Sequence, residues 1–200
     1  MPTVRRTALI ALTGIATLTV ASTAQAGCAV TPTKKAFAAF GDYADYTLAP
    51  GANFESGSSG WSLGGASIVA GNESFFVGSK SDSKSLAISA TGRVVSPSFC
   101  VGIEHPNFRL VARRTTGTWG VLYVKLRSTD SGGRVNETVV GSINGTALGK
   151  WTVSQSYGLS SVLALWSKTQ STTAQIVLDA EKSGGNWQVD DIYIDPYRRS

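Results

Sequence analysis

Acidic side chains gather near the end of the chain, in the stretch GNWQVDDIYIDP that covers residues 185–196. Asp190, Asp191 and Asp195 place three carboxylates within six residues. Carboxylates can act as general acids and bases, as in glycoside hydrolysis, or can bind a hard metal ion such as Ca²⁺. They also accept backbone hydrogen bonds at turns and strand ends. The chemistry of these residues therefore leaves three roles open: catalysis, metal binding and structure.

Other residues with catalytic chemistry are sparse. The single histidine, His105, follows Glu104, but neighbours in an extended segment do not face each other, and Pro106 predicts a turn there. The sequence contains no Gly-x-Ser-x-Gly elbow, His-Glu-x-x-His motif or phosphate-binding loop. Nothing in the spacing of the carboxylates places two of them across a cleft for sugar hydrolysis. We therefore predict no catalytic residue.

Aromatic and hydrogen-bonding side chains fit ligand binding better. Aromatic faces stack on the apolar side of a sugar ring, and amide, hydroxyl and guanidinium groups bind its hydroxyls. Burial in the core is the alternative for each such aromatic, because large aromatic side chains are mostly buried. The candidate ligand-binding residues lie on or beside expected strands and are Trp119, Tyr123, Trp151, Tyr157, Trp166, Arg109 and Arg113.

Short alternating apolar runs occur along most of the chain and are separated by turns rich in Gly, Ser, Asn and Asp, a pattern typical of β-strands. Regularly spaced short strands without helical periods predict an antiparallel sandwich or barrel. Residues 157–168 fit either a short helix or a strand. The expected strands cover 66–70, 74–78, 85–90, 98–103, 107–114, 120–128, 133–143, 150–157, 173–180 and 187–194.

The N-terminal segment has the pattern of an export signal. Arg5 and Arg6 precede an apolar run, and Ala24-Gln25-Ala26 forms a small-x-small cleavage motif. The apolar run is shorter than the roughly 20 residues that span a bilayer, so we expect no membrane span. The formal net charge of +5 is scattered, which disfavours a nucleic-acid partner. We predict a secreted, extracellular monomer with a signal peptide at 1–26, an N-terminal arm at 27–50 and one β-sandwich domain at 51–200.

The chain contains two cysteines, Cys28 and Cys100. Both would reach an oxidising compartment after export, so a single disulfide between them is the simplest assignment. Closing a loop of about 70 residues stabilises a fold by roughly 4 kcal/mol in the chain-entropy description. Lipid attachment at Cys28 is the minor alternative, because Gln25 stands where a lipobox has an aliphatic residue.

Two end motifs carry a resemblance. The sequence reads N-F-E-x-G and then G-W within 53–61, and W-x-V-D-D-I-x-I at 187–194. This pair resembles the first and last strands of jelly-roll carbohydrate-binding modules of the galactose-binding-like type, which include families 4, 9 and 22. The whole mature chain also resembles a group of uncharacterised secreted bacterial proteins. The resemblance implies an all-β, antiparallel jelly-roll β-sandwich with Trp61 and Trp187 in its core.

The same resemblance bears on the carboxylates. It implies that the first and last strands pair and that Phe54, Ile192 and Ile194 enter the core. The two-residue period of a strand then turns Asp190 inward and Asp191 outward. Structural calcium often lies near these strands in the resembling modules, with Glu55 and Asp190 as the carboxylate ligands expected here. The alternative is that Asp190 accepts hydrogen bonds from backbone amides. No other cofactor is expected.

Three functional hypotheses follow. The first is a secreted, non-catalytic β-sandwich that binds a polysaccharide or a cell-wall (cell-envelope) glycan. The alternative is a structural or envelope-associated secreted protein with no sugar site, and the third is a glycoside-active enzyme. Two or more exposed aromatic residues on one face would favour the first, burial of every tryptophan the second, and two carboxylates facing each other in a cleft the third.

Overall fold

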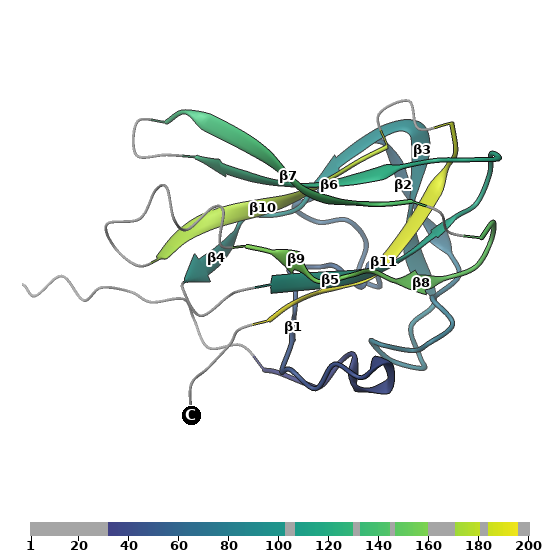
Figure 1. Ribbon diagram of the computed structural model, residues 1–200, viewed down its shortest axis with the longest axis horizontal. Coiled ribbons are helices and arrows are strands. Elements are labelled where there is room, and N and C mark those ends of the chain that lie inside the picture. Colours follow the sequence, from purple (N-terminus) through teal and green to yellow (C-terminus); the bar gives the residue numbers. More distant parts are fainter. Residues whose placement is uncertain are drawn as a thin grey trace, which may run out of the picture.

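The computed structural model describes residues 32–102, 107–129, 133–144, 147–159, 171–180 and 184–195. Apart from one short 3₁₀ helix, η1 (Ala38–Phe40), the regular structure of these residues is β-strand (Figure 1). No helix in this part of the chain is both long and apolar enough to cross a membrane. The strands are β1 (Thr47–Leu48), β2 (Ser62–Ala70), β3 (Lys84–Val95), β4 (Phe99–Gly102), β5 (Asn107–Arg114), β6 (Leu122–Thr129), β7 (Val135–Ile143), β8 (Thr152–Val153), β9 (Tyr157–Gly158), β10 (Ser171–Asp179) and β11 (Trp187–Ile194).

One antiparallel sheet curls over itself to form two layers. Its strand order is β7-β6-β10-β3-β11-β5-β8, with β1 paired to β11, β2 to β3, β4 to β10 and β9 to β5. The long strand β3 belongs to both layers, because Leu86–Ile88 pairs with β11 whereas Arg93–Val95 pairs with β10. Figure 1 shows β7, β6 and β10 above β5, β8 and β11. The predicted antiparallel jelly-roll sandwich is confirmed.

The main core lies between the two layers. Every second residue of β6, from Leu122 to Leu126, is buried there, as strand alternation requires. Trp61 and Trp187 are 8% and 0% exposed and both belong to this core, which confirms their assignment. Phe54 is also fully buried in it with Ile192 and Ile194. The expected first strand at the motif 53–61 is wrong, since residues 51–57 form turns and β11 pairs with β1 instead. Ala49, which follows β1, donates its N–H to the Ile192 carbonyl at 2.9 Å.

A second apolar cluster lies outside the sandwich, beneath the N-terminal segment 34–48. Phe37 and Tyr46 of this segment cover Val111 of β5 and Tyr193 of β11, and Trp151 joins them. The Phe37 and Tyr46 rings meet edge to face at 4.9 Å between centroids. Figure 1 shows η1 and β1 below the lower layer of the sandwich. From here on, "the arm" means residues 34–48, which lie within the predicted N-terminal arm 27–50.

Most of the expected strands are present, and two of them, 107–114 and 187–194, have the predicted bounds. The expected strand 150–157 is reduced to the short strands β8 and β9. Residues 160–170 lie outside the described residues, so the choice between helix and strand stays open there. The strand predicted at 74–78 is wrong. The Glu73 carboxylate accepts the N–H groups of Phe75 and Val77, and Phe76 has a positive φ of 56°, so this segment is a loop.

The predicted facing of the two central aspartates is also wrong. The pairing of β11 with β5 shifts between Asp190 and Tyr193, at a β-bulge. Val189 on one side of the bulge and Ile192 on the other therefore both enter the main core. Asp191 takes a positive φ of 49°, and both aspartates are completely buried. The two-residue alternation, which predicted Asp191 to point outward, does not hold across the extra residue of a bulge.

Candidate functional site

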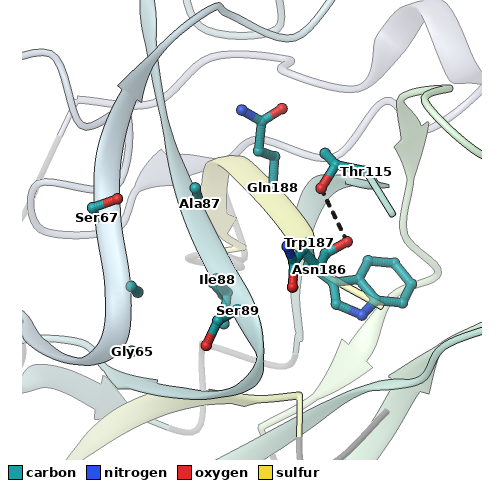
Figure 2. Close-up of a pocket in the computed structure, with 10 residues that line it drawn as sticks. Gly65, Ser67, Ala87, Ile88, Ser89, Thr115, Asn186, Trp187 and Gln188 are labelled. Carbon is teal, nitrogen blue, oxygen red and sulfur yellow. Dashed lines mark hydrogen bonds between the residues drawn. The ribbon is translucent and has the colours of Figure 1, made fainter. Parts of the chain in front are cut away.

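A cavity of about 300 Å³ lies on the outer surface where β2, β3 and β11 run side by side. Figure 2 shows Ser67 on β2, then Ala87 and Ser89 on β3, then Gln188 on β11, with Thr115 beyond it. Its size is at the lower end of the range for ligand pockets. The lining residues are Gly65, Ala66, Ser67, Ala87, Ile88, Ser89, Thr115, Asn186, Trp187 and Gln188.

Strand alternation explains which side chains face this cavity. Leu86 and Ile88 of β3 are buried in the main core, so Ala87 and Ser89 face the other way. In the same manner Trp187 and Val189 of β11 point inward and leave Gln188 outside. The register aligns Ala87 with both Ser67 and Gln188. The cavity wall is therefore a row of small residues and neutral hydrogen-bonding groups across three strands.

Gln188 connects this wall to an arginine and a tryptophan. The Arg113 Nε donates to Gln188 Oε1 at 2.5 Å, and the register places these residues opposite each other on β5 and β11. The Arg113 guanidinium lies 4.6 Å from the centroid of the Trp151 ring, a cation–π distance. Trp151 itself is 9% exposed and packs beneath the arm. Arg113 is thus held at the cavity by one hydrogen bond and one stacked ring.

At one end of the cavity two turns meet, one at Thr115 and Thr116 and the other at Asn186. Asn186 Oδ1 accepts the Ala90 N–H at 2.9 Å, and Asn186 N–H donates to Thr116 Oγ1 at 2.9 Å. Thr115 Oγ1 donates to the Asn186 carbonyl at 3.2 Å, the contact drawn in Figure 2. The indole of Trp119 lies beside Gly184, where a Cβ would come within 3.1 Å of the ring. Trp119 is 62% exposed and lies three residues after Thr116 in the sequence.

Three of the predicted ligand-binding residues lie near the cavity without lining it: Trp119 beside Gly184, Arg113 on Gln188, and Trp151 against Arg113. Tyr123 lies on the outer face of the other layer, with Lys125 Nζ 6.0 Å from its ring centroid. Tyr157 is 1% exposed in the main core, where burial raises its pKa to about 12. Arg109 is paired with Asp42 of the arm at 2.7 Å. Trp166 lies outside the described residues, and so does His105.

Sequence reasoning missed the polar wall of the cavity. Ser67, Ser89, Thr115, Asn186 and Gln188 belong to residue types that are frequent in this chain, so none is conspicuous by type. One signal was present for Gln188, because an amide between the buried Trp187 and Val189 must face outward. The other four residues are recognisable only once the strands and turns are assembled.

Three buried carboxylates form a separate polar cluster at the loop 73–78. Asp190 Oδ2 accepts the Glu73 N–H at 3.2 Å, and Asp190 Oδ1 accepts the Asp191 N–H at 2.9 Å. Asp191 Oδ2 accepts the Gly78 N–H at 2.7 Å, whereas its Oδ1 is buried with no hydrogen-bond partner. Asp190 and Asp191 therefore act on the same loop, contrary to the prediction that they point apart.

The surroundings of these aspartates favour their protonated forms. Burial, and then the charge of Asp191, raises the pKa of Asp190 to about 8. Burial also raises the pKa of Asp191 to about 7, with the charges of Glu73 and Asp82 adding to the effect and Lys34 opposing it. Asp190 and Asp191 are hydrogen-bonded to the loop 73–78 and do not line the cavity. None of the described residues that line the cavity is acidic.

The carboxylate oxygens of the two predicted calcium ligands accept hydrogen bonds from donors within the protein. Glu55 Oε1 accepts the Ser83 and Lys84 N–H groups at 2.8 and 2.7 Å, and Glu55 Oε2 accepts the Ser83 hydroxyl. Both Asp190 oxygens accept amides, as the alternative to calcium binding required. Among the described residues no three His, Cys, Asp or Glu side chains are placed together to hold a metal ion. Calcium bound by Glu55 and Asp190 stays a prediction.

The disulfide, too, stays a prediction. Cys100 lies in β4, and the part of the chain that the structure describes has no free cysteine. Cys28 lies outside that part, as do the export signal and its cleavage motif.

Comparison with known proteins shows similarity in fold. No family model and no curated protein sequence matches the chain. The CBM22-1 xylan-binding domain from Paenibacillus barcinonensis Xyn10C aligns with a TM-score of 0.53 and 16% identity over 78% of this chain and 97% of that domain. The CBM22-1–CBM22-2 tandem domain of the same protein gives 0.54 and 15%, over 78% of this chain and 46% of the tandem. The Clostridium thermocellum xylanase 10B fragment with CBM22-1 and GH10 modules gives 0.48 and 13%, over 74% of this chain and 28% of that fragment.

At these identities the similarity concerns the fold alone. The chain has the β-sandwich fold of carbohydrate-binding modules, which confirms the galactose-binding-like architecture expected from the end motifs.

Proposed function

We propose that this protein is a secreted, non-catalytic module that binds a neutral polysaccharide or cell-envelope glycan in the cavity between β2, β3 and β11. The observation that carries the proposal is the chemistry of the wall. Hydroxyl groups of Ser67, Ser89 and Thr115 and the amides of Asn186 and Gln188 surround one cavity, with no ionisable side chain among its lining residues. Such groups donate and accept hydrogen bonds as sugar hydroxyls do.

Two features at the rim support a sugar as the ligand. Of the four tryptophans that the structure describes, Trp119 is exposed, at 62%, whereas Trp61, Trp151 and Trp187 are at most 9% exposed. An exposed indole beside a polar cavity offers an apolar face for a pyranose ring. The Arg113 guanidinium adds fixed donors next to Gln188. The fold similarity to a xylan-binding domain is compatible with this proposal, although it does not itself specify a ligand.

The structural alternative and the enzymatic alternative are less well supported. A purely structural role leaves the exposure of Trp119 unexplained. Hydrolysis needs two carboxylates separated by about 5–10 Å across the substrate, and none of the described residues that line the cavity is Asp or Glu.

A binding assay on the mature protein tests the proposal. The probes are insoluble xylan, β-1,4-galactan and cellulose in pull-down experiments, followed by a glycan array. Trp119→Ala should weaken retention by roughly 2- to 13-fold, the equivalent of a stacking contribution of about 0.5–1.5 kcal/mol. Gln188→Ala should weaken it as well, because it removes a wall amide and releases Arg113.

Tyr43→Ala is the matched control, since Tyr43 is 69% exposed but lies on the arm. It should retain wild-type binding. Absence of retention on every glycan, or equal losses for Trp119→Ala and Tyr43→Ala, would contradict the proposed site.

A further inference from the structure

The ammonium group of Lys34 is hydrogen-bonded to two backbone carbonyl oxygens. Lys34 Nζ donates to the Val77 carbonyl at 2.6 Å and to the Gly78 carbonyl at 2.7 Å. It also lies 4.8 Å from the centroid of the Tyr193 ring. Lys34 belongs to the arm, whereas its partners belong to the loop 73–78 and to β11. One lysine thus joins three segments that are far apart in sequence.

Two carboxylates lie beside Gly78, whose carbonyl accepts the Lys34 ammonium group. A Cβ built on Gly78 would lie 2.5 Å from both Asp191 Oδ1 and Asp82 Oδ2, so these two oxygens lie close to the Gly78 backbone. The charges of Asp191, Asp82 and Glu73 all act on Lys34 and oppose the effect of burial, which lowers its pKa. Asp191 is fully buried, and its Oδ1 has no hydrogen-bond partner.

This arrangement has the chemistry of a cation site. Backbone carbonyls and carboxylates are the oxygen ligands that Ca²⁺ takes, and buried carboxylates need a compensating positive charge. The cation that the structure places there is the chain's own ammonium group. We propose that Lys34 fills a cation site that is formed by the Val77 and Gly78 carbonyls and lies next to the Asp191 and Asp82 carboxylates, and that it thereby takes the role that a structural calcium ion has in the resembling modules.

Two consequences follow. This place needs no divalent metal, since the tethered ammonium group already supplies a positive charge there. Removal of the ammonium group leaves the oxygen ligands unpaired and turns the same place into a site for Ca²⁺. Lys34 also helps to hold the arm against the loop, together with the Phe40–Phe75 ring contact and the packing of Val77 with Phe37.

Thermal unfolding of the mature protein tests the proposal. The wild type should melt at the same temperature with EDTA and with millimolar CaCl₂. Lys34→Met should melt roughly 5–15 °C lower in EDTA, because buried carboxylates lose their partner, and Ca²⁺ should recover several degrees of that loss. Lys34→Arg, which keeps a positive charge, should show no calcium effect.

The neighbouring lysine supplies the matched control. Lys35 has a side chain that is 57% exposed and forms a surface ion pair with Asp45 at 3.6 Å. The melting temperature of Lys35→Met should therefore be close to that of the wild type and should not change with Ca²⁺.

Terbium luminescence gives a second readout that does not depend on stability. Tb³⁺ has the ligand chemistry of Ca²⁺, and Tyr193 lies close enough to Lys34 to sensitise its emission. Emission should appear with Lys34→Met and be lost when Asp191→Asn is added. Three results would overturn the proposal: a wild type that EDTA destabilises, a Lys34→Met variant that does not respond to Ca²⁺ or Tb³⁺, or one that remains unfolded in millimolar Ca²⁺.

Discussion

Buried carboxylates set the loop 73–78 through hydrogen bonds to its backbone. Glu73 accepts two amides of its own loop, and Asp190 and Asp191 hold the two ends through the Glu73 and Gly78 N–H groups. Phe76 keeps a left-handed conformation within this frame. Such a conformation costs a non-glycine residue roughly 1–2 kcal/mol and persists only where the surroundings impose it. The three acids therefore have a structural role that depends on their burial.

Stability should fall as pH rises. Folding raises the pKa of Asp190 to about 8 and that of Asp191 to about 7. A carboxyl group whose pKa is raised on folding stabilises the fold fully below its unfolded pKa of about 4, and this contribution is lost as pH rises through the folded pKa. The urea midpoint should therefore be lower at about pH 8.5 than at about pH 5.

Asp191→Asn should reduce this slope. The amide oxygen can still accept the Gly78 N–H, and the side chain cannot ionise. A variant with the same dependence on pH as the wild type would show that Asp191 does not carry the effect.

At the scale of elements, the antiparallel pairing of β2 with β3 forms one side of the cavity. The register shifts between Gly64 and Ala66 of β2, where β3 has the extra residues, around Gly92. The backbones come close there, because a Cβ on Gly92 would lie 2.7 Å from the Gly65 carbonyl oxygen and 2.7 Å from Ile88 Cγ2. The lack of a side chain at Gly92 is therefore a packing requirement.

Gly92→Ala should destabilise the protein by roughly 1–3 kcal/mol, the usual cost of overpacking, and should also weaken glycan binding because Gly65 and Ile88 line the cavity. Urea unfolding and the xylan pull-down measure the two effects. Gly71→Ala is the control, since Gly71 has a positive φ of 109° but open space around it. It should lose roughly 1 kcal/mol and no binding. Similar behaviour of both variants would refute the packing argument.

At the scale of the whole molecule, the arm is part of the folded unit. Its Phe37 and Tyr46 are 0% and 2% exposed against β5 and β11, and its Asp42 is paired with Arg109. The last strand, β11, thus has covered surfaces on both sides: the main core on one and the arm on the other. A domain that begins only at residue 51 would expose the second cluster.

Deletion of residues 27–46 should therefore lower the free energy of unfolding by roughly 3–6 kcal/mol, from the exposure of two aromatic side chains and their partners. Trp151 fluorescence should shift to longer wavelength, because the arm covers that ring. The deletion also removes Cys28, so Cys28→Ala with an intact arm is the control for the predicted disulfide. If the deletion is no less stable than Cys28→Ala, the arm does not belong to the folded unit.

Local alternation in the sequence was enough to predict an antiparallel sandwich or barrel and the bounds of the strands 107–114 and 187–194. The jelly-roll sandwich and the burial of Trp187 were expected from the end motifs. Side-chain alternation is a property of each strand by itself, so it can be recognised without the rest of the fold. The cavity could not be predicted, because its wall joins Ser67, Ser89 and Gln188 from three strands whose register depends on pairing.

The carboxylates of the final strand show the same limit most clearly. Their number and spacing were evident from the sequence, but the bulge at Asp190 and Asp191 arises from the pairing of β11 with β5, and both side chains are buried at the same loop instead of pointing apart. Lys34 and Gly78 lie 44 residues apart. Contacts between segments so distant in sequence form only when the chain folds, and for that reason the tertiary structure alone decided which charges meet.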